Sequence, residues 1–208
     1  MRVKQFSYTP ADDNLTGFAS NVSGAAFTLT ATTPGDGMAH LIIVTNDSVT
    51  DHSGKTIALV GTDAQGNAQT ETLTGPGTST TSTSTKYFKT LTSATPSATI
   101  GADTFDIGWT DDVISPIFVP DYKQSPFNMG IGLDVSGTIS ITIQHTFDDP
   151  FDKTLAYSSR TWLNHSSLVS KTTDSDGNYA APIRGIRVLV NSLTNGATVK
   201  VTYAQGSV

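Results

Sequence analysis

The chain has no cysteine, so disulfide bonds and thiolate metal sites are both excluded. Charged residues make up only 14% of its 208 residues, and glutamate occurs once, at Glu71, against 17 aspartates. Because Glu, Lys and Arg usually cover the solvent face of helices, their shortage disfavours helical structure. No apolar run reaches the length of a membrane-spanning helix, and the opening "MRVKQFSYTP" lacks the apolar core of a secretory signal. We therefore expect a protein that folds in a cytoplasm and has no membrane partner.

Basic residues are also scarce. Lys and Arg together number 12, the formal net charge is −6 and the isoelectric point is near 4.9. Binding to a nucleic-acid backbone requires a stripe of cations, and the closest basic pair here is Lys86 and Lys89. The sequence therefore predicts no nucleic-acid partner.

Threonine is the residue present in excess, with 34 copies. Its branched β-carbon favours strands, and short alternating segments separated by turn residues run through the whole chain. A short helix is conceivable only in 153–170, where the apolar spacing is poor, and Thr194-Asn195-Gly196 turns the last predicted hairpin. The predicted strands are 26–32, 40–45, 55–62, 68–74, 86–94, 104–109, 113–119, 138–147, 183–192 and 197–205.

These elements predict an all-β fold, an antiparallel β-sandwich or jelly-roll-like structure, with two similar sandwich halves as one option. On that option residues 1–25 form an N-terminal arm or a first strand, and 26–112 and 127–208 form the halves. The proline-rich segment 113–126 crosses between them, while a single domain over 1–208 is the alternative. The low-complexity segment 75–85 is expected to be a mobile loop tip or an ordered edge in an assembly.

The pattern Thr-Asp-x-x-Gly-Asn occurs at 62–67 and again at 173–178. Asp caps its own turn, and Gly and Asn tolerate positive φ, so we interpret both copies as turns, with a weak cation site as the alternative. The second copy does not fit a calcium-binding EF-hand loop, because its glycine comes too early and Gly185 stands where a glutamate is required.

Few residues indicate catalysis. Asp148, Asp149 and Asp152 follow a predicted strand; they suit an ordinary turn, with a glycosidase carboxylate pair or a cation site as alternatives. No serine lies in a G-x-S-x-G nucleophile elbow. No His-x-His or His-Glu-x-x-His pair occurs, so we predict no metal site, no cofactor and no enzyme activity, and His145 is expected to lie in the core. The four histidines are His40, His52, His145 and His165.

Two tryptophans, Trp109 and Trp162, allow a further hypothesis. Exposed tryptophans stack on sugar rings, which would make the chain a carbohydrate-binding adhesin module. Buried positions are the commoner fate of tryptophan in a sandwich, and Trp109 closes an alternating run with Phe105 and Ile107. We therefore expect Trp109 in the core or at an interface.

Several segments carry a family resemblance. They are "IALVGTDAQGNAQTETLTGP" (57–76), "KYFKTLTSATPSATIGADTFDIGW" (86–109), "ITIQHTFDDPFD" (141–152), "YAAPIRGIRVLVNS" (179–192) and "VKVTYAQG" (199–206), together with the isolated Trp162. This set resembles small virion structural proteins of tailed double-stranded DNA phages. It covers most of 40–206, and its motifs are structural, with no catalytic residue among them.

The resemblance implies a non-enzymatic role in the virion, reached after assembly in the host cytoplasm. The expected function is capsid decoration (cement), which stabilises the head by binding neighbouring capsid subunits. The implied partners are the major capsid protein or other virion proteins, and a homo-oligomer is expected because symmetric assembly multiplies weak interfaces. A tail or head-to-tail adaptor component is the alternative within the virion.

Overall fold

The computed structural model describes residues 2–152 and 154–206, and nearly all of their regular structure is β-strand. This confirms the predicted all-β fold of antiparallel sheets packed in sandwich fashion. One 3₁₀ turn, η1 (Tyr157–Ser159), is the only helical element of the described residues. The strands are β1 (Arg2–Tyr8), β2 (Asn14–Val22), β3 (Ala39–Asn46), β4 (Thr56–Thr62), β5 (Ala68–Thr74), β6 (Thr81–Phe88), β7 (Thr90–Pro96), β8 (Phe105–Ile114), β9 (Met129–Ser136), β10 (Ile139–Thr146), β11 (Leu163–Asn164), β12 (Ser175–Tyr179), β13 (Gly185–Leu193) and β14 (Thr198–Gln205).

The chain divides into two compact units, each described here by itself. The terminal unit comprises residues 1–12 and 114–208, and the central unit comprises residues 13–113. The division differs from the predicted one at the N-terminal end. Residues 2–8 form strand β1, which pairs with β14 from Arg2 opposite Gln205 to Tyr8 opposite Val199. The start of the chain is thus an edge strand of the terminal unit.

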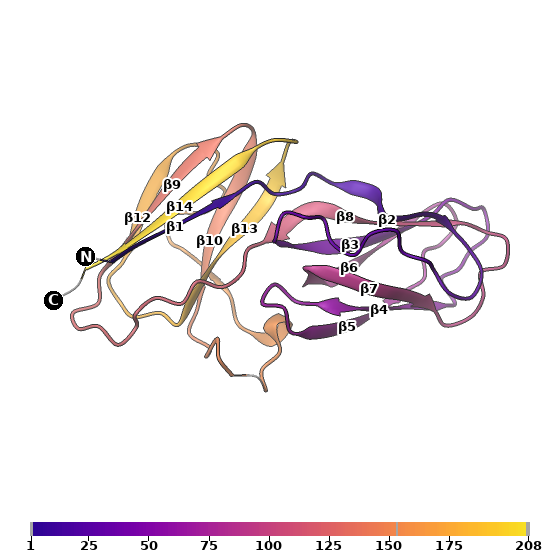
Figure 1. The fold of residues 1–208 in the computed structure, drawn as a ribbon, viewed down its shortest axis with the longest axis horizontal. Coiled ribbons are helices and arrows are strands. Elements are labelled where there is room, and N and C mark those ends of the chain that lie inside the picture. The colour runs from indigo at the N-terminus through magenta and orange to yellow at the C-terminus, as the bar shows by residue number, and fades with distance from the viewer. Residues whose placement is uncertain (1, 153, 207–208) are drawn as a thin grey trace. The chain divides into compact units, whose positions relative to one another are not determined.

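The terminal unit contains a four-stranded antiparallel sheet in the order β1-β14-β9-β12 and a second layer in which β10 pairs with β11 and β13 (Figure 1). Alternation on β10 and β13 buries Ile141, Ile143 and Val188. Between the layers, the rings of Phe118 and Tyr203 stack in parallel with their centroids 4.4 Å apart. Burial of these apolar side chains is the main source of stability in such a sandwich.

The central unit places β8 between β2 and β3, with β6 beyond β3, and a separate sheet has the order β5-β4-β7. The edges of the two sheets meet at β5 and β6, where side chains link them. Glu71 on β5 accepts hydrogen bonds from the backbone N–H groups of Thr85 (2.8 Å) and Lys86 (3.0 Å). In return the Lys86 ammonium donates to the carbonyl of Thr70. The only glutamate of the chain therefore satisfies backbone donors that an edge strand would otherwise leave open.

Several predicted strands are corrected. Residues 26–32 form a loop, because Thr30 donates from its N–H and its hydroxyl to the carbonyl of Phe18 while Phe27 is buried against Phe105. The predicted strand 86–94 is two strands, β6 and β7, which belong to different sheets. The chain changes sheet at Lys89, whose N–H donates to Thr62. In the predicted loop 75–85, β6 begins at Thr81 and forms an ordered edge.

Other differences also come from tertiary pairing. The predicted strands 104–109 and 113–119 are replaced by one longer strand, β8, which ends at Ile114. The second Thr-Asp-x-x-Gly-Asn copy is no turn from Ser175 onward, because it forms the edge strand β12 along β9. The possible helix in 153–170 is reduced to η1. Strands β2, β9, β11 and β12 were absent from the prediction, whereas β1 corresponds to the first strand that was one of the two options for residues 1–25. Glycines mask the apolar alternation of β9, and β2 is irregular in its pairing with β8.

Candidate functional site

The loop between β4 and β5 is organised by Asp63, whose side chain is 4% exposed. One of its carboxylate oxygens accepts the N–H groups of Gln65 and Asn67, both at 2.9 Å. Gly66 supplies the positive φ of +84° that the tight turn needs. The predicted turn is therefore confirmed at 62–67, and the carboxylate that would ligand a cation is already used by backbone donors.

Each of the three clustered aspartates accepts a backbone hydrogen bond, and Asp149 and Asp152 do so as caps of their own turns. Asp148 accepts the N–H of Thr161 (2.6 Å), Asp149 accepts the N–H of Phe151 (3.0 Å), and Asp152 accepts from both the N–H and the hydroxyl of Thr154. The pKa of Asp149 is lowered, mainly by the Phe151 backbone donor and then by Arg184, and that of Asp152 by Thr154. A general acid needs a raised pKa, so these shifts run against a glycosidase pair.

Two histidines of the central unit, His40 and His52, are buried and hydrogen-bonded. His40 lies between the carboxylate of Asp36 (2.8 Å) and the carbonyl of Thr110 (2.9 Å). His52 faces Asp103 at 2.9 Å and the ammonium of Lys55 at 2.8 Å. These contacts join loops of the central unit to one another and to strand β8. Among residues 2–152 and 154–206, no group of three or more His, Asp or Glu side chains is placed to hold a metal ion.

His145, expected in the core, is only half-buried and belongs to a polar cluster in the terminal unit. Its Nδ1 lies 2.9 Å from the hydroxyl of Tyr179 on β12, and His165 packs against the same Tyr179 ring with its centroid 4.7 Å away. Burial, and then the nearby His165, lowers the pKa of His145. Burial also raises the pKa of Tyr179, so the neutral imidazole accepts a hydrogen bond from the neutral phenol.

The two tryptophans differ in their surroundings. Trp109 is in the core of the central unit, as expected, and meets Phe18 edge-on with the ring centroids 4.9 Å apart. Its ring lies directly over Gly17, where a β-carbon would overlap it, so no sugar can reach this face. Trp162 is half-buried, and the guanidinium of Arg187 covers its ring at 4.1 Å. One face of Trp162 is therefore occupied by a cation–π contact.

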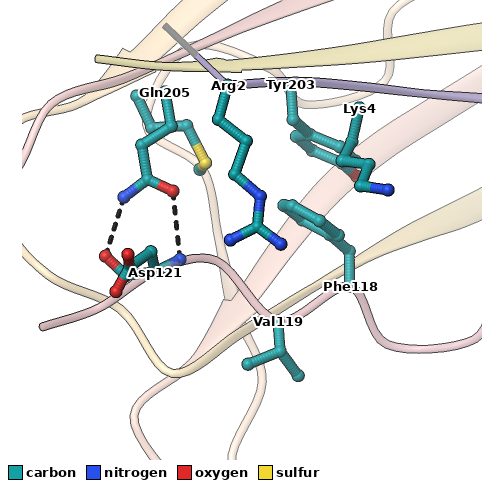
Figure 2. A pocket seen from close by; sticks show the side chains of 8 residues that line it. Arg2, Lys4, Phe118, Val119, Asp121, Tyr203 and Gln205 are labelled. Atoms are coloured by element: carbon teal, nitrogen blue, oxygen red, sulfur yellow. Dashed lines mark hydrogen bonds between the residues drawn. The ribbon is translucent and has the colours of Figure 1, made fainter. Parts of the chain in front are cut away.

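A small pocket opens beside β1 in the terminal unit, and Figure 2 shows its lining. Arg2 and Lys4 extend from β1 on the side of the stacked Phe118 and Tyr203 rings. Asp121 is held at the rim by Gln205, which donates to its carbonyl (2.7 Å) and accepts its N–H (3.0 Å). The sequence analysis missed this pocket because its residues come from four separate segments: β1, residues 118–121, β9 and β14. With two cations in its lining, this small pocket suits contact with an acidic side chain better than enclosure of a small molecule.

Other predicted features have plain structural roles. Of the basic pair, Lys86 is bound to the carbonyl of Thr70, and Lys89 lies where β6 passes into β7. In the part of the chain that the structure describes, no helix has the length and apolar character to span a membrane. No protein-family model matches the chain, and no curated protein matches it in sequence.

Proposed function

We propose that this protein is a non-enzymatic structural component of a tailed-phage virion, and most specifically a head decoration protein that binds neighbouring capsid subunits. The observation that carries the proposal is that the clustered carboxylates and imidazoles of this protein form structural hydrogen bonds within the chain. Asp63 and Asp149 bind backbone donors of their own turns, and Asp148 binds that of Thr161. His40 joins a loop to strand β8, and His52 joins two loops. Side chains already used in this way by structural hydrogen bonds favour a structural role over turnover of a substrate.

The resemblance to virion proteins in the sequence supplies the setting, and the fold is compatible with it. Both units are antiparallel and free of cysteine, so their stability is independent of the redox state of a host cytoplasm. The exposed edge strand β1 offers backbone groups for intermolecular pairing. The net charge of −6 favours a position on the outer face of a shell, away from packaged DNA.

Electron microscopy of the parent particles with a gold-labelled antibody against this chain tests the proposal. We expect gold over the whole icosahedral shell. Gold confined to one vertex or to the tail would replace decoration by the adaptor or tail role. Gold on no particle would overturn the virion proposal, and glycan binding that is lost in a Trp162→Ala variant would then support the carbohydrate-binding alternative.

A further inference from the structure

Strand β1 forms one edge of the four-stranded sheet of the terminal unit, where it pairs with β14 (Figure 1). Arg2, Val3, Lys4, Gln5 and Ser7 are exposed along this strand of seven residues. In the part of the chain that the structure describes, no strand pairs with the opposite side of β1. An edge strand of this length leaves a row of backbone N–H and C=O groups without partners in the sheet, and such a row is a template for a further strand.

Both cations of β1 lie on the inner face of this sheet. Arg2 lies opposite Gln205, and Lys4 lies opposite Tyr203. Residues that lie directly opposite each other in an antiparallel pair share a face. Because Gln205 and Tyr203 are both buried, this is the face that packs on the second layer of the unit. The two cations therefore stand at the open rim of the sandwich, beside Phe118 (Figure 2).

The rim beside β1 has more positive than negative charge. Among residues 2–152 and 154–206, neither the Arg2 guanidinium nor the Lys4 ammonium forms an ion pair or a side-chain hydrogen bond. Strand β1 has no acidic residue, and of the residues that line the pocket only Asp121 is acidic. The next carboxylate along the chain, on Asp12, comes after the opposite end of the strand. The two cations thus outnumber the one carboxylate beside them, in a chain whose net charge is −6.

The same cations determine which strand can pair with this edge. Charges on the inner face of an edge strand oppose the addition of most strands, because the added strand would cover them without neutralising them. Pairing of β1 with β1 of a second copy would bring together four cations and only the two carboxylates of Asp121. A strand with acidic side chains at alternate positions would instead place a carboxylate opposite each cation. Cross-strand pairs of opposite charge stabilise a sheet, so the edge favours an acidic strand.

We propose that the free edge of β1 binds an extended acidic segment of a partner protein of the virion by strand addition. The backbone of this segment continues the sheet, and its carboxylates at alternate positions lie opposite Arg2 and Lys4. In such pairing the backbone hydrogen bonds supply affinity, and the alternate side chains supply specificity. That the partner belongs to the virion rests on the proposed function, whereas the acidic chemistry of the segment rests on β1 and its surroundings.

The first test uses the full chain and two short synthetic peptides, one of alternating threonine and glutamate and a matched control of alternating threonine and lysine. Each peptide is titrated into the protein while NMR follows the backbone amide signals and hydrogen exchange of residues 2–8. We expect the glutamate peptide to shift these signals and slow their exchange, and the lysine peptide to change neither. The net charge of −6 by itself attracts the lysine peptide, so the expected preference cannot come from overall charge. Equal effects of the two peptides on β1, or no effect of either, would overturn the proposal.

Reversing the charges of β1 separates the proposed specificity from a folding defect. The Arg2→Glu/Lys4→Glu variant should bind the glutamate peptide at least about fivefold more weakly and should now bind the lysine peptide, which a misfolded protein would not do. The control variant Lys89→Glu/Lys171→Glu has the same net charge, and it should bind the glutamate peptide within about twofold of the wild type. Lys89 lies in the central unit, and Lys171 lies beside β10. An unchanged preference of the β1 variant for the glutamate peptide would overturn the proposal.

Parent particles prepared without the chain connect the edge to the proposed function. We expect the wild type to bind these particles, and the Arg2→Glu/Lys4→Glu variant to bind them at least about fivefold more weakly. Equal binding by the two proteins would overturn β1 as the contact while leaving the virion role intact. A wild type that binds the glutamate peptide but no particle would count against the proposed function instead. If the signals of residues 2–8 shift with protein concentration in the absence of peptide, a second copy occupies the edge and the proposal is wrong.

Discussion

The same six-residue pattern, Thr-Asp-x-x-Gly-Asn, has two different structures in this protein. At 62–67 it closes the hairpin between β4 and β5, with Asp63 buried at its centre and Gly66 at positive φ. At 173–178 its second half is the edge strand β12, in which Gly177 is extended and pairs with Ile131. Asp174 does not cap its own turn, and it accepts the N–H of Val135 on the neighbouring strand.

The difference lies in what surrounds each copy. The first copy stands between two alternating strands that pair in register from Thr56 opposite Thr74 to Thr62 opposite Ala68, so a turn must form there. The second copy passes beneath His165 and Leu168, which approach Gly177 too closely for a side chain to fit between them. In the first copy glycine is needed because the backbone has a positive φ, and in the second because no side chain fits between the neighbouring residues.

The largest expected difference in stability between the two copies comes from replacing the aspartate of each. Asp63→Ala leaves the N–H groups of Gln65 and Asn67 without their acceptor in a buried site, which should destabilise the central unit by about 2–4 kcal/mol. Asp174→Ala removes one exposed acceptor and should cost less than about 1 kcal/mol. Hydrogen exchange followed by mass spectrometry measures both, in peptides from β4–β5 and from β9–β12. Equal losses of protection would show that the two copies are equivalent, contrary to their structures.

Replacing the glycine should destabilise the two copies for different physical reasons. A β-carbon on Gly177 would lie 2.8 Å from His165 and 2.9 Å from Leu168, so Gly177→Ala should cost about 1–3 kcal/mol through overlap. A β-carbon on Gly66 would have no atom within 4 Å beyond those of the adjacent residues. The cost of Gly66→Ala, about 1–2 kcal/mol, therefore comes from the positive φ alone. Asparagine tolerates this φ, so Gly66→Asn should recover part of the loss in urea unfolding, while Gly177→Asn should recover none. Recovery at both positions would remove the distinction.

These contrasts explain which parts of the fold the sequence could predict. Strands β10, β13 and β14 were found because their alternation is strong and both ends carry turn residues. Residues 26–32 alternate just as clearly but form a loop, since their apolar side chain Phe27 is buried by docking against Phe105. Local pattern reports which side chains are buried, and only tertiary pairing decides whether the backbone that carries them is a strand.

The candidate surfaces were less predictable still. The cluster Asp148, Asp149 and Asp152 stood out as a carboxylate group, and the turn caps formed by Asp149 and Asp152 fit its place after a strand. The shape of the same loop also depends on Arg160 and Arg184, which return from later in the chain to brace it. No local pattern links these residues. The pocket beside β1 was unpredictable for the same reason, because it depends on the pairing of β1 with β14, which lie at opposite ends of the sequence.

The smallest expected effect concerns the attachment of β12 through Tyr179 to His145. Because burial, and then His165, lowers the pKa of His145 below its unfolded value of 6.5, the unfolded chain takes up this proton first as the pH falls. The stability that the neutral His145 provides is therefore fully present above pH 6.5. It is lost at lower pH, when Nδ1 is protonated and can no longer accept the hydrogen of the Tyr179 hydroxyl. We expect the free energy of unfolding to fall more steeply between pH 7.5 and 5.5 in the wild type than in a His145→Gln variant. The comparison cancels the effect of pH on ionisable groups that do not contact residue 145, which both proteins share. If the free energy of unfolding changed with pH in parallel in the two proteins, β12 would be held by its backbone pairing with β9 alone. The hydrogen bond between Tyr179 and His145 would then contribute nothing to the attachment of this strand.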